Sequence, residues 1–249
     1  MSRSLFLFAA LLFSTFSHAE DVHVAVAANF TAPMQKLAQQ FEQDSGHKVT
    51  LSFGSTGKFY AQIKNGAPFD VLLAADDATP AKLAKEGLAI ADSLFTYAIG
   101  KLVLWSASST LIDDKGEVLK QGGFTHLAIA NPRLAPYGAA AIESLKALGL
   151  LETLQPKFVQ GENIAQTFQF VVSGNAALGL VAMSQVYEDG KLKSGSAWVV
   201  PARLHAPIRQ DAILLEKGKA NSAATALLRF LKSESAKQLI RAYGYDFQE

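Results

Sequence analysis

Residues 51–76, LSFGSTGKFYAQIKNGAPFDVLLAAD, contain the pattern that decides the fold. An apolar run at 49–53 ends in Gly-Ser-Thr-Gly, a helical period over 58–65 closes at Gly66, and a second apolar run follows at 70–74. Short apolar runs that alternate with helical periodicity are typical of βαβ units. This stretch therefore predicts an α/β fold with largely parallel strands.

The same alternation continues on both sides of this stretch. Strands are expected at 22–27, 127–130, 177–181 and 211–215, besides one long strand at 97–105. Helices are expected at 33–44, 79–86, 139–148, 164–172, 222–232 and 235–243. No break in composition marks a simple tandem boundary, so the pattern is compatible with a discontinuous first lobe into which a second lobe is inserted.

Composition excludes several classes of protein. The chain of 249 residues is 49% hydrophobic and has no cysteine, which excludes a disordered chain, a disulfide scaffold, a zinc–thiolate module and thiol catalysis. Lys and Arg number 23 against 22 Asp and Glu, a formal charge of +1. A near-neutral chain has no electrostatic footprint for nucleic acid or for an anionic membrane surface.

The first 19 residues, MSRSLFLFAALLFSTFSHA, have the layout of a secretory signal peptide. A cationic start at Arg3 precedes an apolar core over 5–16, and small residues flank His18. The apolar core is shorter than the roughly 20 residues that span a bilayer. We expect cleavage after Ala19 and export of residues 20–249, without a lipid anchor because no cysteine follows.

Four strand-to-helix junctions share one design. They lie at 27–31, 54–57, 131–138 and 161–164, and each passes from a strand into a helix through small or hydrogen-bonding residues. The start of a helix exposes up to four N–H groups and the positive end of the helix dipole, so it binds oxyanions without a formal positive charge. Taken alone, each hydrogen-bonding residue of these junctions is typical of an ordinary helix cap. Together, at the carboxyl ends of strands in two regions, they predict an oxyanion site between two lobes.

The junctions and the segments around them resemble one family. The similar stretches are VAVAANF (24–30), LSFGSTGKFYAQIKNGAPFDVLLAAD (51–76), FTYAIGKLVLWS (95–106), LAIANPRLAPYG (127–138), GENIAQTF (161–168), AALGLVA (176–182) and FLKSESAKQLIRAYGY (230–245). They are similar to the periplasmic molybdate-binding proteins of bacterial ABC importers, the ModA family, over nearly all of the chain after the signal peptide.

The resemblance implies a two-lobed periplasmic binding protein of type II. Each lobe would hold a mixed, mostly parallel sheet, with residues 20–98 and 205–249 in lobe 1 and residues 99–204 in lobe 2. Two crossing hinge segments would lie near 95–100 and 200–205. The implied protein is a monomer without catalytic activity, cofactor or bound metal cation, and it delivers its ligand to the membrane permease of an ABC importer.

The family's oxyanion site falls on six residues of this chain. They are Ala28, Asn29, Ser55, Thr56, Tyr137 and Ile164. The chain departs from many members in having Asn29 and Thr56 where they have serine. Some members also have a tyrosine where this chain has Ala182, and Tyr137 is expected to replace that donor.

The resemblance implies molybdate or tungstate as the ligand, held by neutral donors and selected by size. An alternative is that the same scaffold binds another oxyanion, such as sulfate, or a small organic anion. An exported two-lobed enzyme is a third class, but the junctions offer no acid–base pair. Gly54-Ser55-Thr56-Gly57-Lys58 lacks the P-loop spacing, and no G-x-S-x-G motif or His pair of metal-ligand spacing occurs.

Overall fold

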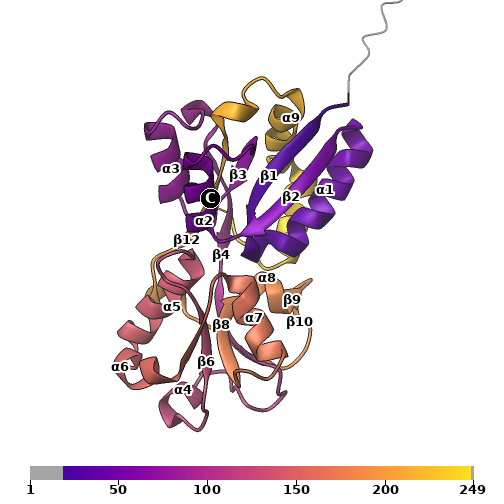
Figure 1. Cartoon of the computed structure of the whole chain (residues 1–249). Helices are drawn as coiled ribbons and strands as arrows, with labels where there is room; N and C mark the ends of the chain where they lie inside the picture. Colours follow the sequence, from indigo (N-terminus) through magenta and orange to yellow (C-terminus); the bar gives the residue numbers. More distant parts are fainter. Residues whose placement is uncertain (1–18, 248–249) are drawn as a thin grey trace, which may run out of the picture.

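The computed structural model describes residues 19–247, which form two halves, each built around a five-stranded sheet (Figure 1). The predicted signal peptide lies outside these residues, except for Ala19. Among the described helices, none combines the length and the apolar character that crossing a membrane would need.

The first half is a sheet covered by helices on both faces. Its strands lie in the order β2 (Lys48–Gly54), β1 (Asp21–Ala27), β3 (Val71–Leu73), β12 (Ile208–Leu214) and β4 (Phe95–Gly100). The apolar sides of α1 (Thr31–Ser45), α9 (Ser222–Leu231) and α10 (Glu234–Ala242) pack on one face. Those of α2 (Thr56–Lys64) and α3 (Ala78–Lys85) pack on the other.

The second half repeats this architecture. Its strands lie in the order β11 (Ser196–Val199), β5 (Leu102–Ser106), β8 (Leu178–Ala182), β6 (Leu127–Ala130) and β7 (Phe158–Gly161). One face packs against α4 (Val118–Gln121), α5 (Pro136–Ala147) and α6 (Leu151–Leu154). The other packs against α7 (Ile164–Val172) and α8 (Met183–Val186), and a small hairpin of β9 (Tyr187–Glu188) and β10 (Lys191–Leu192) follows.

Both sheets are mixed, and the parallel share is smaller than the sequence predicts. In the first half, β1 pairs in parallel with β2 and β3, whereas β12 is antiparallel to β3 and β4. In the second half, β6 pairs in parallel with β7 and β8, whereas β5 is antiparallel to β8 and β11. Parallel pairs are therefore half of each sheet rather than most of it.

The expectation of one long strand at 97–105 is wrong. The chain forms β4 in the first sheet, leaves it after Gly100, and enters β5 of the second sheet at Leu102. Both strands are apolar because both are buried, so the apolar run does not reveal the crossing. The chain returns from β11 through a short 3-10 helix at Ala202–Leu204 to β12. These two crossings join the halves.

Candidate functional site

The six residues predicted to hold an oxyanion surround one cavity between the two halves. The empty space between its lining atoms is about 210 Å³, including the part open to solvent. The lining residues are Ala27, Ala28, Asn29, Gly54, Ser55, Thr56, Ala75, Ala135, Pro136, Tyr137, Asn163 and Ile164. All of them except Ala75 come from the four predicted junctions, and none carries a formal charge. Ala182, where some members of the resembling family have a tyrosine, is fully buried and lies outside this lining.

Ser55 presents a buried hydroxyl to this cavity. It is the N-cap residue of α2, with extended backbone, but its side chain makes no capping hydrogen bond. The Ser55 Oγ atom is buried and has no hydrogen-bond partner among residues 19–247. A buried polar atom without a partner costs free energy. The hydroxyl is thus available to a ligand in the cavity.

Thr56 plays a different part from its neighbour. Its Oγ1 accepts the backbone N–H of Ala75 at 2.9 Å, which ties the start of α2 to the end of β3. Because Thr56 is the first residue of α2, its own N–H lies where the helix supplies no acceptor. Thr56 can therefore offer both a backbone N–H and a hydroxyl proton to the cavity.

Asn29 lies in a one-turn 3-10 helix, Ala28–Phe30, which follows β1 directly. Its side chain is buried, and its Nδ2 donates to Gln210 Oε1 at 2.7 Å and to the Tyr245 hydroxyl at 3.0 Å. The residue thus lines the cavity while its amide hydrogens are bonded behind it.

Tyr137 comes from the second half, in the first turn of α5. The helix was expected to begin at Ala139, but it begins at Pro136, a residue favoured at the first helical position because it needs no N–H acceptor. The Tyr137 hydroxyl accepts from Gln210 Nε2 at 3.1 Å. Burial raises the pKa of Tyr137 well above its ordinary value, so the hydroxyl keeps its proton and acts as a neutral donor.

Ile164 is the first residue of α7. The Asn163 side chain caps this helix and accepts the N–H groups of Ala165 and Gln166, both at 3.0 Å. The N–H of Ile164 is left out of that cap. It is therefore available to a ligand, and the contact that the sequence predicts for it stays a prediction.

Sequence reasoning missed a second layer of polar residues behind the cavity. Gln210, Tyr97, Tyr245 and Ser184 are buried and bonded to Asn29, Tyr137 or one another. Burial raises the pKa of Tyr245 to about 12, so it too stays neutral. These residues lie far from the four junctions in sequence and belong to no short motif, so no local signal marked them.

Contacts between the halves close the cavity. Gly57 N–H, in the first turn of α2, donates to the Leu134 carbonyl oxygen at 3.0 Å. Lys58 of the first half forms an ion pair with Glu162 of the second, and both side chains stay about half exposed. The Glu162 side chain is thus partly exposed and paired across the cleft.

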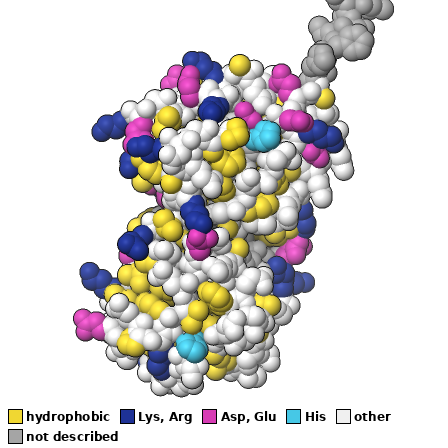
Figure 2. Space-filling model, in the orientation of Figure 1, with side chains coloured by type: hydrophobic (Ala, Val, Ile, Leu, Met, Phe, Trp, Pro, Cys, Tyr) yellow, Lys and Arg dark blue, Asp and Glu magenta, His cyan; other side chains and the backbone are white. Residues whose placement is uncertain are grey.

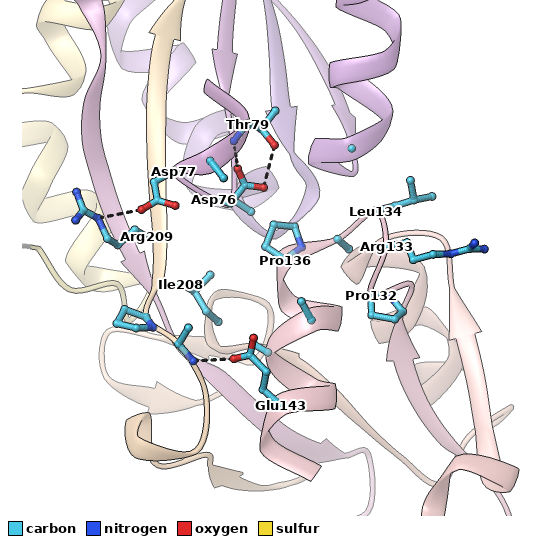
Figure 3. Close-up of a pocket in the computed structure, with 18 residues that line it drawn as sticks. Asp76, Asp77, Thr79, Pro132, Arg133, Leu134, Pro136, Glu143, Ile208 and Arg209 are labelled. Atoms are coloured by element: carbon cyan, nitrogen blue, oxygen red, sulfur yellow. Dashed lines mark hydrogen bonds and ion pairs between the residues drawn. The ribbon is translucent and has the colours of Figure 1, made fainter. Parts of the chain in front are cut away.

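A wider groove adjoins the cavity and shares Ala75, Ala135 and Pro136 with it (Figure 3). Figure 2 shows the surface hollowed between the two halves. The groove lining includes three carboxylates: Asp76 accepts from Thr79 N–H at 2.7 Å, Asp77 faces Arg209, and Glu143 accepts from Ala206 N–H at 2.8 Å (Figure 3). No three His, Asp or Glu side chains among residues 19–247 gather where they could hold a metal ion. The neutral cavity, rather than the groove, has the chemistry of an oxyanion site.

Two mixed α/β halves, joined by two crossings and closed over a cavity at the ends of their strands, define a two-lobed solute-binding protein. Residues 22–246 match the family described as bacterial extracellular solute-binding protein. The chain is 59% identical to the molybdate-binding protein ModA of Azotobacter vinelandii, over 100% of this chain and 98% of that one. The chain belongs to the ModA family of molybdate-binding proteins.

Two further comparisons agree. The identity to the molybdate-binding protein ModA of Rhodobacter capsulatus is 52%, over 91% of this chain and 88% of that one. The solved structure of the Azotobacter vinelandii periplasmic molybdate-binding protein superposes with a TM-score of 0.89 at 41% identity, covering 92% of this chain and 100% of that one. The two-lobed periplasmic binding protein fold is thereby confirmed.

Proposed function

We propose that this protein binds molybdate, and equally tungstate, in the periplasm and delivers it to the membrane permease of an ABC importer. The mature protein would be a monomer starting at Glu20, without catalytic activity. The observation that carries the proposal is the Ser55 hydroxyl, buried in a neutral cavity without a hydrogen-bond partner in the described part of the chain. The names of the similar proteins support molybdate as the particular oxyanion.

The proposed ligand contacts are the six predicted residues. Ser55 and Thr56 would donate hydroxyl protons, Tyr137 or Asn29 a side-chain proton, and Ala28, Thr56, Tyr137 and Ile164 backbone N–H groups. Each hydrogen bond to a charged acceptor contributes about 1.5–3 kcal/mol, so a handful suffices for tight binding after the costs of association. A fully deprotonated dianion needs only donors, whereas a protonated phosphate also needs an acceptor.

Closure of the two lobes would sequester the anion. The boundary expected between residues 98 and 99 falls inside β4, so we assign residues 20–100 and 205–249 to lobe 1 and residues 101–204 to lobe 2, with motion about the two crossings. The Gly57–Leu134 hydrogen bond and the Lys58–Glu162 ion pair join the lobes in the closed form. That form, in which both lobes present one continuous surface, would be recognised by the permease.

A melting scan of residues 20–249 against molybdate, tungstate, sulfate, phosphate and a small carboxylate tests the proposal. A ligand at 100 times its Kd adds about 2.7 kcal/mol, which raises the Tm of a chain this long by about 5–11 °C. We expect this rise with molybdate and tungstate alone. A rise with sulfate or the carboxylate would assign the scaffold to that ligand instead, and no rise with any anion would overturn the oxyanion function.

Replacing Ser55 by alanine separates ligand binding from folding. We expect Ser55→Ala to weaken molybdate about tenfold or more, because it removes one hydrogen bond to a charged acceptor. The ligand-free protein should melt no lower than wild type, since the substitution removes a buried hydroxyl that has no partner in the fold. Calorimetric titration and a ligand-free melt measure the two quantities.

The matched control is Ser144→Ala in α5. Ser144 is equally buried, but its Oγ donates to the Ala140 carbonyl oxygen at 2.8 Å, two turns away from the cavity end of the helix. Its loss should leave molybdate affinity unchanged. Equal affinity of Ser55→Ala and wild type would remove Ser55 from the site.

A further inference from the structure

Gln210 connects the donors on the two sides of the cavity. It lies on β12 beside an irregularity in the pairing with β4, and its side chain is completely buried. Its Oε1 accepts from Asn29 Nδ2 at 2.7 Å and from the Tyr97 hydroxyl at 3.0 Å. Its Nε2 donates to the Tyr137 hydroxyl at 3.1 Å. One amide therefore bonds to a cavity residue from each lobe.

Of the two side chains bonded to Gln210, Asn29 and Tyr137, only Tyr137 can donate a proton to an anion in this arrangement. Both amide hydrogens of Asn29 are used, one by Gln210 and one by the Tyr245 hydroxyl at 3.0 Å. Asn29 therefore has only its Oδ1 left, which is an acceptor and repels an oxyanion. The Tyr137 oxygen accepts from Gln210, so its own proton is not used in that bond and can be donated to an anion in the cavity.

Rotating the side-chain amide groups of Asn29 and Gln210 by 180° gives the opposite arrangement. The nitrogen and oxygen atoms of each amide exchange places, and no other heavy atom moves. Asn29 Oδ1 then accepts from Gln210 Nε2, and Asn29 Nδ2 is available to the cavity. Gln210 Oε1 now faces the Tyr137 hydroxyl, which must donate to it. In this second arrangement, Asn29 donates to the anion and Tyr137 does not.

The surrounding groups satisfy either arrangement. The Tyr97 hydroxyl lies 3.0 Å from the Ala74 carbonyl oxygen, so it can donate there when Gln210 turns its nitrogen toward it. The Tyr245 hydroxyl can donate to Asn29 Oδ1 instead of to the Asn29 carbonyl oxygen, 2.9 Å away. That carbonyl keeps the hydrogen bond from Ser184 Oγ at 2.7 Å. No buried polar group of this network loses its partner in the exchange.

We propose that Gln210 is a positioning residue that lets one of two side chains, Asn29 or Tyr137, donate to the bound oxyanion, but never both at once. This inference rests on the proposed function, because it concerns donors to the same anion. It makes the two donors substitutes for each other, so that removing either one turns the Gln210 amide toward the arrangement that uses the other.

The test is a double-mutant cycle of Asn29→Ala and Tyr137→Phe, with molybdate affinity measured by calorimetry. Each single variant should bind molybdate within about fivefold of wild type, because the other donor takes over. The double variant should bind about 10- to 100-fold more weakly, since a charge-assisted hydrogen bond is then lost outright. Additive losses, or an Asn29→Ala change without effect in the Tyr137→Phe background, would overturn the inference.

Gln210→Glu provides an independent arm. A carboxylate only accepts hydrogen bonds, so Asn29 and Tyr137 would both donate to it and neither to the anion. Adding Tyr137→Phe to Gln210→Glu should then cost nothing further. A further loss of affinity in the Gln210→Glu background would show that the tyrosine still donates to the anion and would overturn the inference.

Two controls keep the outcomes distinct. A ligand-free melt shows whether each variant folds, and if Gln210→Glu does not, the cycle at Asn29 and Tyr137 decides alone. Tyr60→Phe removes a hydroxyl that bonds to Glu86 on the surface at 2.9 Å and should leave affinity unchanged. If the wild-type protein does not bind molybdate, the proposed function itself is overturned. If the wild-type protein binds molybdate but the affinity losses of Asn29→Ala and Tyr137→Phe are additive, only the role of Gln210 is overturned.

Discussion

Gly100→Ala will lower molybdate affinity about 10- to 100-fold and reduce the Tm of the ligand-free protein. Gly100 ends β4 and is buried opposite Ile208 of β12. A Cβ at this position would overlap the Tyr137 hydroxyl oxygen and lie 2.6 Å from Gln210 Nε2. One methyl group therefore displaces the tyrosine of lobe 2 and the amide that orients it, at the crossing where the lobes are joined.

The expected effect of Gly100→Ala is large because the side chains of Tyr137 and Gln210 have little space into which they could move. Tyr137 is 2% exposed and Gln210 is 0% exposed, so neither side chain can swing into solvent. Overpacking of this kind costs about 1–3 kcal/mol, a fall of roughly 2–12 °C in the Tm of a chain this long. The expected loss of affinity is about 10- to 100-fold, because the displaced groups serve both alternative donors and the one side-chain hydrogen bond that they provide to the anion is lost.

Gly123→Ala is the matched control, because a Cβ at Gly123 would meet no atom within 4 Å. Its Tm and its affinity should equal those of wild type. Calorimetry with molybdate and a ligand-free melt measure both variants. A Gly100→Ala protein with wild-type affinity would show that the Tyr137 hydroxyl and Gln210 do not take part in binding.

Most of the candidate site could be predicted because it is built from local patterns. A strand followed at once by small polar residues and a helix fixes both the position and the direction of the helix start. The junctions at Asn29, at Ser55 and at Asn163 are of this kind, and the cavity lies among them. The start of α5 was misplaced by three residues, although Pro136 is the signal that would have located it.

The second layer could not be predicted, because its partners are joined only by the tertiary fold. Asn29 and Gln210 are 181 positions apart, and Asn29 and Tyr245 are 216 apart. A lone glutamine in an apolar strand carries no spacing that indicates a partner. The sequence also did not indicate that β4 and β5 are separate strands in different sheets. Both strands are buried and apolar, and Lys101 is the one polar residue between the two apolar runs.

Ile164→Pro will weaken molybdate about 10- to 100-fold while leaving α7 intact. Ile164 is the first residue of α7, a position where proline is well tolerated because the helix does not use that N–H. Asn163 has φ −145° and ψ 176°, the extended conformation that a residue before proline requires. The substitution therefore deletes one backbone donor to the anion, which no ordinary side-chain replacement can do.

Two further variants isolate the contribution of the N–H group. Ile164→Ala keeps the N–H but loses the buried side chain, so the ratio of its affinity to that of Ile164→Pro measures the backbone hydrogen bond alone. Glu234→Pro places proline at the first position of α10, far from the cavity, after Ser233 with φ −70° and ψ 155°. It should fold and bind molybdate as wild type does. If Ile164→Pro and Ile164→Ala bind molybdate equally well, the anion does not contact the start of α7, and the lobe 2 side of the site rests on Tyr137 alone.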